Sequence, residues 1–463
     1  MFVGHGENGI IISEHIVEDQ KTNIIINGDL IKSKECYLTP NVYQKKDNYI
    51  FISKNKDLYN EYSKIFNNFD KSNEMYQVRL LNFNSNNNKT FYNPFLFASS
   101  NADIVSFVNG FIGSFSYVAT KPLNRTEMIK GLHYLMQMLC LYVFNYEDDD
   151  NKSLKVVKKY LDTMANDVSI LDMKVAEMIK EPGIYALDDF YRFFLAFKTL
   201  SYEVQVESIY QIKKIFDNIS KTKIWDSINM NNSITMQELI AEKNALFIIP
   251  SSEFPISDMF LFQFLSAQKN LEEIAAKGKM LNMFKIKTSL EEVVERFDSS
   301  NFFNIFLYDF NHLNITNNLM AFFMNYNAHS AINIFTDDEN VLYDKLQSVN
   351  KYFQLFFEIV IDFTGNTIYP NKYFNKKAKM NLKENEMNIF KLSFDGNEPD
   401  IHMLLDNIYD YTSHPNFNGK ETRKRKKTIS KEEQQKVDVE NIFKNIECHT
   451  KSDGVKNTNK WKF

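Results

Sequence analysis

Short clusters of apolar residues separated by polar stretches fill the first hundred positions of this chain. Clusters of this length, bounded by Asn, Lys and Asp, are typical of strands in a sheet that is covered on both faces. They predict strands at 23–26, 48–53 and 77–83. Apolar residues spaced three to four positions apart predict a helix at 58–69, which would join the last two strands into a β-α-β unit.

A helical periodicity replaces this pattern from about residue 102 to residue 225. Apolar positions recur at i, i+3, i+4 and i+7, for example at Met128, Leu132 and Leu135, and turn signals separate the successive stripes. We expect an all-α block here. Strand-like clusters then return, together with an amphipathic helix at 256–276; the strands are predicted at 245–250, 302–307, 331–335 and 356–363.

Strands that alternate with crossover helices on both sides of a helical block predict a doubly wound, mainly parallel α/β sheet with an inserted all-α domain. After residue 414 too little apolar surface remains to offset the entropy of ordering the chain. The expected division is a first α/β part at 1–101, the inserted all-α domain at 102–235, a second α/β part at 236–370, a C-terminal extension at 371–413 and a disordered polar tail at 414–463.

The charge balance argues against a protein that binds nucleic acid over its whole surface. Such proteins are usually basic, whereas this chain has a net charge of −5 and a pI near 6.0. One strong positive patch lies in the tail, at Arg423, Lys424, Arg425, Lys426 and Lys427. This basic cluster could contact DNA phosphates or anionic lipid, or it could simply keep the tail in solution.

Other kinds of chemistry are weakly represented. Cys36, Cys140 and Cys448 are isolated, so the sequence supports neither a disulfide framework nor a zinc site and favours a reducing compartment. The eight histidines show no metal-ligand spacing. No uninterrupted apolar run reaches the ~18 residues that a membrane helix needs, so we expect a cytoplasmic protein.

A glycine-rich segment near the N-terminus follows the phosphate-loop spacing G-x-x-x-x-G-K-[ST] through Gly4, Gly6 and Gly9. Ile10 and Ile11 stand where the phosphate-binding lysine and the Mg²⁺-binding hydroxyl should be, so the loop is degenerate. One interpretation is weak nucleotide binding at the start of a helix that we expect near Gly9 or Ile10. The other is a strand-to-helix turn that holds no ligand.

Asp309 follows the predicted strand at 302–307, where acids that coordinate Mg²⁺ lie in nucleotide-hydrolysing sheets. In a hydrolase of this kind a glutamate follows that aspartate and activates the attacking water, but here the next residue is Phe310. Asp309 is therefore either a vestigial metal ligand or an ordinary acid in a turn.

The order of these motifs resembles the TraG-like type IV secretion coupling proteins, inner-membrane ATPases that pass DNA or protein to a conjugation or secretion channel. Two matches are specific. Tyr92-Asn93-Pro94-Phe95 is the family's sequence before its helical insertion, and Ala245-Leu246-Phe247-Ile248-Ile249-Pro250 is the strand that leads back into the sheet. The resemblance covers about residues 2–366 and implies a P-loop NTPase-like (RecA-like) fold.

Several residues of this chain differ from the family's motifs. In the family's sensor strand a glutamine senses the nucleotide, and Thr336 occupies that position here. Of the family's D-P-K-G-E-L sequence only the last two positions are similar, in Asp57-Leu58. No Arg or Lys occurs at 324–330, where the family's hexameric ring places a basic residue. The family's N-terminal membrane helices are expected to be absent or to belong to another polypeptide.

These features lead to a hypothesis of a degenerate coupling-protein homologue, a non-catalytic substrate receptor or regulatory component of DNA or protein transfer. Implied partners are secretion-channel or relaxosome proteins, DNA, further copies of the chain, or an active membrane-anchored homologue that holds it at the cytoplasmic face. ATP and Mg²⁺ are expected only if the degenerate site still binds them. Two alternatives remain: an ATPase that recruits Lys21, Lys54 or Lys56 to an unorthodox site, and a DNA-binding or scaffold module that uses the basic cluster.

Overall fold

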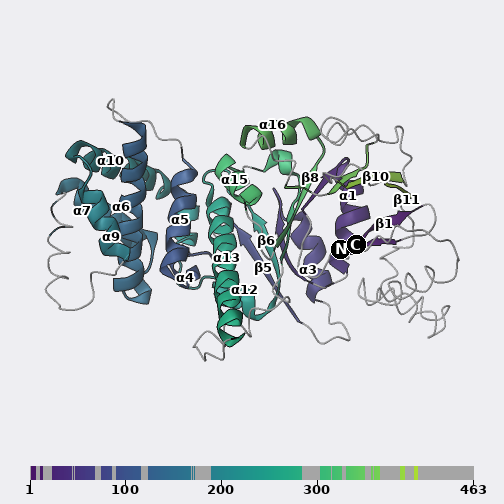
Figure 1. The fold of residues 1–463 in the computed structure, drawn as a ribbon, viewed down its shortest axis with the longest axis horizontal. Coiled ribbons are helices and arrows are strands. Elements are labelled where there is room, and N and C mark those ends of the chain that lie inside the picture. Colours follow the sequence, from purple (N-terminus) through teal and green to yellow (C-terminus); the bar gives the residue numbers. More distant parts are fainter. Residues whose placement is uncertain are drawn as a thin grey trace.

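A computed structural model gives the fold of the chain (Figure 1). The residues that it describes are 2–6, 11–13, 23–43, 45, 47–67, 75–85, 90–115, 124–167, 169, 172, 189–283, 303–313, 315–325, 330–349, 356–357, 359–364, 386–391 and 401–404. The predicted disordered tail at 414–463, including the basic cluster, lies outside the described residues, as do Gly9, Ile10 and Lys21.

The strands of this described part form one eleven-stranded sheet in the order β2-β1-β11-β10-β9-β3-β8-β7-β4-β6-β5. The seven strands from β9 to β5 are all parallel, as expected for strands joined by crossover helices. They are β3 (Ile24–Asn27), β4 (Asn48–Ile52), β5 (Tyr76–Asn82), β6 (Lys243–Ile249), β7 (Phe303–Leu307), β8 (Ser330–Thr336) and β9 (Ile359–Asp362).

Alternate side chains of the parallel strands enter two different cores. In β3, Ile25 packs into the larger core on one face, whereas Ile24 and Ile26 pack into the smaller core on the other face. Because both faces are covered, the strands are apolar throughout and not alternating, which is why they were recognisable in the sequence.

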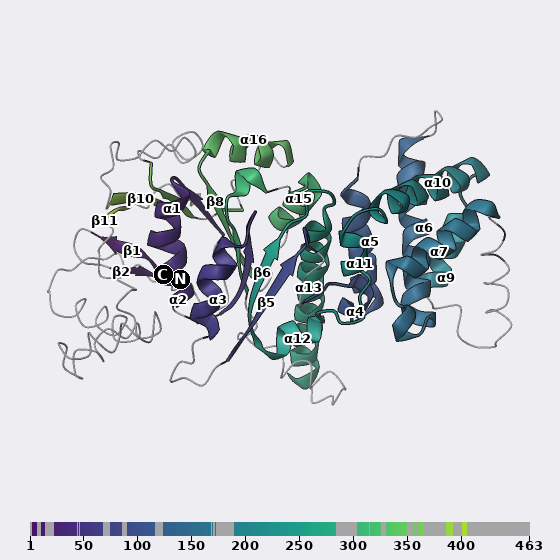
Figure 2. The same ribbon diagram turned by 180° about the vertical axis from the view of Figure 1, so that it is seen from behind.

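Helices cover the two faces of the sheet in separate layers. Figure 1 views the sheet nearly edge-on, with α1 and α3 on the side of the smaller core and α13, α15 and α16 on the other; Figure 2 shows α2 with α1 and α3. Their bounds are α1 (Leu30–Ser33), continued by the π-helical turn η1 (Lys34–Leu38) into α2 (Thr39–Tyr43), then α3 (Asp57–Asn67), α13 (Ile256–Met283), α15 (Asn317–Asn325) and α16 (Glu339–Val349). The predicted doubly wound α/β class is confirmed.

The predicted β-α-β unit is correct in its elements but not in its pairing. Strand β4, helix α3 and strand β5 fall where the periodicity places them, but β6 lies between the two strands. The strand that returns from the helical insertion thus occupies a central position in this half of the sheet, and β5 is left at its edge.

Both ends of the described chain meet beyond β9, in an antiparallel extension of the sheet. Strand β10 (Glu386–Lys391) pairs with β9 and with β11 (Ile401–Leu404). The N-terminal strand β1 (Phe2–Gly6) pairs with β11 and with β2 (Ile11–Ser13). The expected C-terminal extension at 371–413 therefore contributes two strands to the sheet.

The predicted all-α block is a set of helices at the end of the molecule away from this extension, with α13 between it and the sheet (Figures 1 and 2). One continuous apolar core joins these helices to the sheet, so the boundaries at 102 and 235 stay a prediction. The helices are α4 (Pro94–Phe97), α5 (Asn101–Gly113), α6 (Arg125–Tyr146), α7 (Leu154–Asn166), α9 (Asp189–Lys198), α10 (Tyr202–Ile219), α11 (Ile224–Ser227) and α12 (Met236–Ala241).

Gly131 allows α6 and α10 to cross closely. A Cβ placed at Gly131 would overlap the Ser208 hydroxyl and lie 3.0 Å from Val204 Cγ1. We expect Gly131→Ala to lower the free energy of unfolding by about 1–2 kcal/mol, since overpacking outweighs the gain in helix propensity. Chemical denaturation measures this effect. Adding Ser208→Ala should restore most of the loss, and a double mutant that restores nothing would contradict the close crossing.

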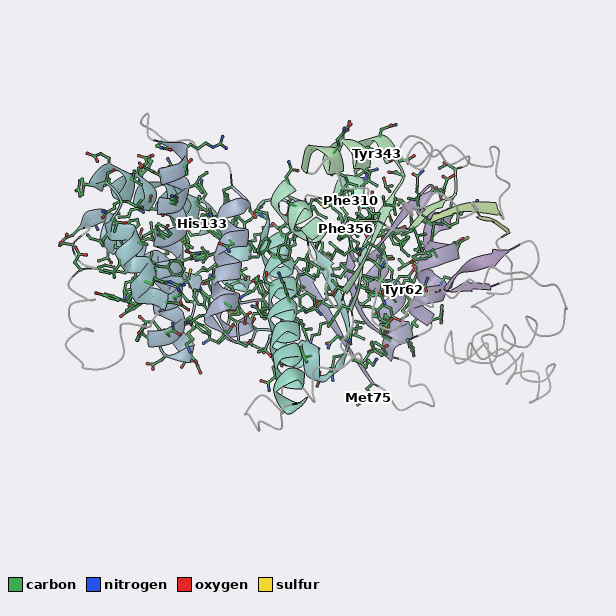
Figure 3. All side chains as sticks on the ribbon, viewed as in Figure 1. Tyr62, Met75, His133, Phe310, Tyr343 and Phe356 are labelled. Carbon is green, nitrogen blue, oxygen red and sulfur yellow. The ribbon has the colours of Figure 1, made fainter. Side chains whose placement is uncertain are left out.

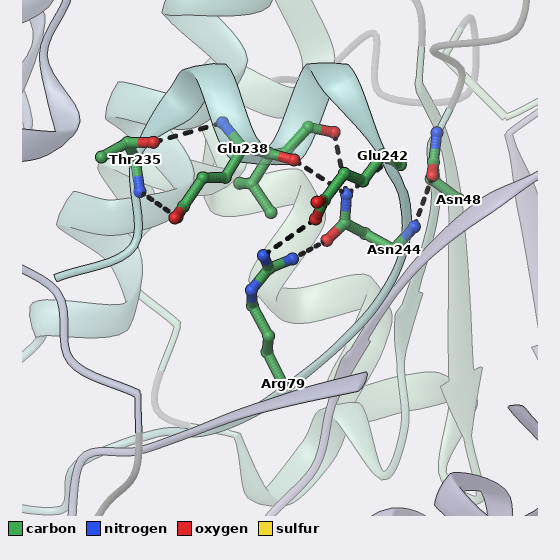
Figure 4. A network of polar contacts seen from close by, with 7 residues as sticks. Asn48, Arg79, Thr235, Glu238, Glu242 and Asn244 are labelled. Atoms are coloured by element: carbon green, nitrogen blue, oxygen red, sulfur yellow. Dashed lines mark hydrogen bonds and ion pairs between the residues drawn. The ribbon is translucent and has the colours of Figure 1, made fainter. Parts of the chain in front are cut away.

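Buried polar contacts fix the start of β6 at the opposite edge of the sheet from the carboxyl ends of the strands (Figure 4). The side-chain amide nitrogen of Asn244 donates to the carbonyls of Leu239 at 3.0 Å and Glu242 at 2.7 Å, which closes the end of α12. Its oxygen accepts from Arg79 on β5, and its backbone N–H donates to Asn48 Oδ1 at 2.7 Å. Asn244, on β6, thus joins α12 to β4 and β5, the strands on either side of β6.

Candidate functional site

The carboxyl ends of β3 and β8 lie side by side, with Asn27 opposite Thr336. The chain leaves β3 toward α1 on one face of the sheet and leaves β8 toward α16 on the other. In open α/β sheets, ligands bind in the crevice where neighbouring strands send their helices to opposite faces. This carboxyl edge is therefore the candidate site.

Gly28 makes the turn from β3 into α1. Its φ of +141° is a conformation that favours glycine. Its N–H donates to the Thr336 carbonyl at 2.9 Å, while the N–H of Phe363 donates to the Asn27 carbonyl at 2.9 Å. A Cβ on Gly28 would lie 2.7 Å from Phe363 Cβ. The turn is thus held from both neighbouring strands with no room for a side chain.

Asp29 lies at the N-terminus of the helix that follows β3. Its carboxylate oxygen Oδ1 accepts a hydrogen bond from the Lys32 backbone N–H at 2.8 Å, which makes it the N-cap of α1. A phosphate bound at a helix N-terminus uses the same unpaired N–H groups. The chain therefore places its own negative charge where a phosphate would bind.

Lys32 and Ser33 form a lysine-serine pair on the first turn of the helix that follows β3. Ser33 is fully buried, and its hydroxyl donates to the Asp29 carbonyl at 2.8 Å. The ammonium of Lys32 lies 5.5 Å from the centre of the Phe363 ring, within the range of a cation–π contact. Both residues have the chemistry of a phosphate loop, but in this structure their polar groups contact the protein itself.

The lysine-serine pair does not fit the phosphate-loop pattern, because it follows its glycine too closely. The pattern G-x-x-x-x-G-K-[ST] places the lysine six positions after the first glycine, but Lys32 follows Gly28 by four. A local signal did exist, namely three consecutive isoleucines, Asn-Gly and then Lys-Ser. Only the strand order shows that this turn lies at the carboxyl edge.

The glycine segment chosen from the sequence lies elsewhere. Gly4 and Gly6 belong to β1, and Ile11 belongs to β2, which pairs antiparallel with β1 at the end of the sheet. The expected helix from Gly9 or Ile10 is therefore wrong, since the chain continues into a strand. A hairpin at the end of a sheet places no helix N-terminus beside a phosphate, so the interpretation as a strand-to-helix loop is also wrong.

Asp309 lies at the end of β7, as predicted, in a left-handed conformation with φ of +59°. Its Oδ1 lies 2.6 Å from His312 Nδ1, so the carboxylate is paired with a side chain of the same turn, η5 (Phe310–His312). The preceding Tyr308 donates its hydroxyl to the Leu30 carbonyl at 3.0 Å. Burial and the nearby Asp309 and Glu61 raise the pKa of Tyr308 to about 12, so it remains a neutral donor that joins β7 to α1.

Phe310, which stands where the sequence resemblance predicts a glutamate, is completely buried on the side of α16 (Figure 3). The Lys345 ammonium from α16 lies 5.0 Å from the centre of its ring. The hydroxyl of Thr336, the residue predicted at the sensor position, lies within hydrogen-bond distance of Asn311 Oδ1 at 3.1 Å and of the Asp338 carbonyl at 2.9 Å. Both side chains therefore hold the turns after β7 and β8 together.

Of the lysines proposed for an unorthodox site, Lys54 and Lys56 follow β4 and are exposed. Lys32, by contrast, lies on the helix that directly follows β3, a strand that borders the crevice. Among the residues that the structure describes, no three His, Cys, Asp or Glu side chains are grouped to hold a metal ion.

The motif at 92–95 connects the sheet to the helical insertion. Asn93 caps α4 by accepting from the Phe95 N–H at 3.0 Å, and its side-chain amide donates to the Lys152 carbonyl at 2.9 Å. Its backbone N–H donates to the Ser233 hydroxyl at 2.6 Å. The motif thus joins the segments that enter, turn within and leave the insertion.

Comparison with known proteins gives a match by structure alone, since no family model and no curated protein matches the chain. The unbound form of the bacterial conjugative coupling protein TrwBdeltaN70 aligns with a TM-score of 0.50 and 10% identity over 87% of this chain and 88% of that one. This chain has the fold of a conjugative coupling protein. The predicted P-loop NTPase-like fold is thereby confirmed, and so is the resemblance to the TraG-like family at the level of fold.

Two further solved structures are similar. One is the plasmid coupling protein TrwB in complex with the ATP analogue ADPNP, with a TM-score of 0.49, 9% identity and coverage of 88% of this chain and 94% of that one. The other is VirB4 of Thermoanaerobacter pseudethanolicus, with a TM-score of 0.47, 11% identity and coverage of 88% and 96%. Within the described residues of the present coupling-protein fold, no helix is both long and apolar enough to span a bilayer.

Proposed function

We propose that this chain is a coupling-protein homologue that does not turn over nucleotide and serves as a substrate receptor or regulatory component of conjugative transfer or secretion. The proposal rests on the Asp29 carboxylate, which caps α1 where a phosphate would bind. Ser33 and Asp309 support it, since their polar groups are engaged by the Asp29 carbonyl and by His312. Phe310 offers no group that could activate water.

The partners that fit this role are secretion-channel or relaxosome proteins, DNA, and an active, membrane-anchored homologue. Association with such a homologue would place the chain at the cytoplasmic face of a membrane. Vestigial roles for Asp309 and Thr336, and DNA or lipid contact by Arg423–Lys427, belong to the same proposal. Co-purification with and without residues 414–463, over a range of salt concentrations, tests the role of the tail, because phosphate contacts weaken steeply with salt.

Mg-ATP titration by calorimetry, with a parallel hydrolysis assay, tests the central proposal. We expect no saturable heat at millimolar Mg-ATP and no turnover above that of Asp309→Asn. Asp29→Asn is the matched variant, because asparagine caps a helix equally well but carries no charge. If the Asp29 charge excludes phosphate, this variant gains measurable binding that Lys32→Ala then removes.

The second candidate function is an ATPase with an unorthodox site, and the position of Lys32 and Ser33 on the helix after β3 favours it. In that case the wild-type chain binds Mg-ATP at submicromolar concentration and hydrolyses it. Lys32→Ala abolishes both, while Lys54→Ala, which changes an exposed lysine after β4, leaves them unchanged. This outcome would replace the proposal of a non-catalytic component.

A further inference from the structure

Asp258 is a buried carboxyl group in the first turn of α13, on the face of the sheet that carries the helical insertion. Its side chain is 2% exposed. Oδ2 accepts a hydrogen bond from the Thr316 backbone N–H at 2.7 Å. Among the described residues, Oδ1 has no hydrogen-bond partner. A carboxylate satisfied on only one oxygen is poorly stabilised away from water.

This contact holds the start of α15. The Thr316 hydroxyl accepts from the Leu319 N–H at 3.3 Å, and its carbonyl accepts from the Met320 N–H at 3.1 Å, so Thr316 caps the helix that Asp258 holds. Thr316 follows the turn that carries Asp309 and His312. Helix α13 also packs along α5 (Figure 1). Asp258 therefore connects the candidate site to the helical insertion.

The environment of Asp258 favours its neutral form. Burial raises the pKa of this carboxyl to about 7, and the Thr316 hydrogen bond and the neighbouring Ser257 hydroxyl oppose that shift without cancelling it. The ionisable groups on the surrounding elements are Glu253 before α13, Asp103 on α5, and Asp309 and His312 before α15, while α15 itself has none. None of these charges contributes to the shift at Asp258, so it comes from burial.

We propose that Asp258 is a proton-dependent latch between α13 and α15, closed while its carboxyl group is neutral and opened more readily once that group is ionised. Opening exposes the carboxylate to water and releases the start of α15. The segment between β7 and α15 then separates from the helix that supports the insertion.

The direction of the pH dependence follows from linkage. The closed state keeps its proton up to about pH 7, whereas an opened, hydrated aspartate loses it above about pH 4. The opening equilibrium constant therefore rises about tenfold per pH unit between these values and levels off above pH 7. The latch is most stable at acidic pH. This stabilisation is lost as the pH rises to the pKa of the closed state, about 7.

Amide hydrogen exchange of the wild-type chain between pH 5 and pH 8, corrected for intrinsic exchange, measures this opening. The Thr316, Leu319 and Met320 amides should lose about fiftyfold in protection between pH 5 and pH 7 and only about twofold more by pH 8. The core strand β7 is an internal reference, since its amides report global opening. Uniform changes in β7 and α15 would overturn the latch, because they would report the whole fold.

Asp258→Asn tests the assignment to this residue. Asparagine keeps an oxygen that can accept from the Thr316 N–H but cannot ionise. The hydrogen-exchange protection of the α15 amides, measured relative to β7, should therefore no longer depend on pH. Asp103→Asn is the matched control, because Asp103 is equally buried but accepts hydrogen bonds from Ser99 and Asn270. The Asp103→Asn variant should keep the wild-type pH dependence of α15 protection. If Asp258→Asn also keeps it, the proposal is wrong.

Discussion

Replacing Gly28 with alanine is expected to lower the free energy of unfolding by about 4 kcal/mol, through backbone strain and overpacking of similar size. The φ of +141° suits only glycine, and the new Cβ would meet Phe363 Cβ at 2.7 Å. Phe363 cannot move away easily, because its N–H is bonded to the Asn27 carbonyl in continuation of the pairing between β9 and β3. Chemical denaturation followed by circular dichroism measures the loss.

Gly113→Ala is the matched control for Gly28→Ala. Gly113 ends α5, is exposed and has no positive φ, so alanine should leave stability unchanged or raise it by up to about 1 kcal/mol. Equal effects of the two substitutions would show that the turn after β3 tolerates a side chain. Phe363 would then not lie as close to this turn as the structure shows. The explanation that the turn is held from both neighbouring strands with no room for a side chain would also be wrong.

Replacing Asn244 with alanine should lower the free energy of unfolding by about 3 kcal/mol, since several buried groups lose their partners at once. The Leu239 and Glu242 carbonyls lose their donor, and the Arg79 guanidinium loses an acceptor (Figure 4). Asn244 itself is fully buried, so water cannot readily replace its amide. Thermal and urea unfolding of the purified variant would measure the effect.

Glu242→Gln separates this network from the ion pair beside it. Glu242 pairs with Arg79 at 3.1 Å, but 43% of its side chain is exposed, and exposed pairs contribute at most about 1 kcal/mol. The variant should therefore be nearly as stable as the wild type. If Glu242→Gln proved as damaging as Asn244→Ala, the stabilisation would come from the charge of Glu242 and not from the buried amide.

Local patterns in the sequence predicted most elements of the sheet and the insertion. The strands β4, β7 and β8 fall within a residue or two of their predicted bounds, because a strand buried on both faces must be apolar along its length. Helix α13 begins at Ile256 as predicted but runs on to Met283. The motifs at 92–95 and 245–250 also lie where they are predicted, at the entry to the helical insertion and at the return to the sheet.

The candidate site was predicted less well than the fold. Asp309 and Thr336 follow strands that the sequence revealed, so they were placed at the correct edge. Glycine spacing favours Gly4–Ile11 as the phosphate loop over Gly28–Ser33, whose spacing is two residues shorter. Glycine spacing indicates where the chain can turn. It does not indicate where the strand before that turn lies in the sheet.

The amino-acid sequence by itself determined the fold class, the helical insertion and the two junction motifs of this coupling-protein fold, since these depend on periodicity and on contacts close along the chain. Only the tertiary structure decided that β3 lies between β8 and β9, that β6 separates β4 from β5, and that Asp29 and His312 engage the polar groups of the candidate site. The physical reason is that strand order and side-chain pairing depend on hydrogen bonds between segments hundreds of residues apart, for which a local pattern carries no signal.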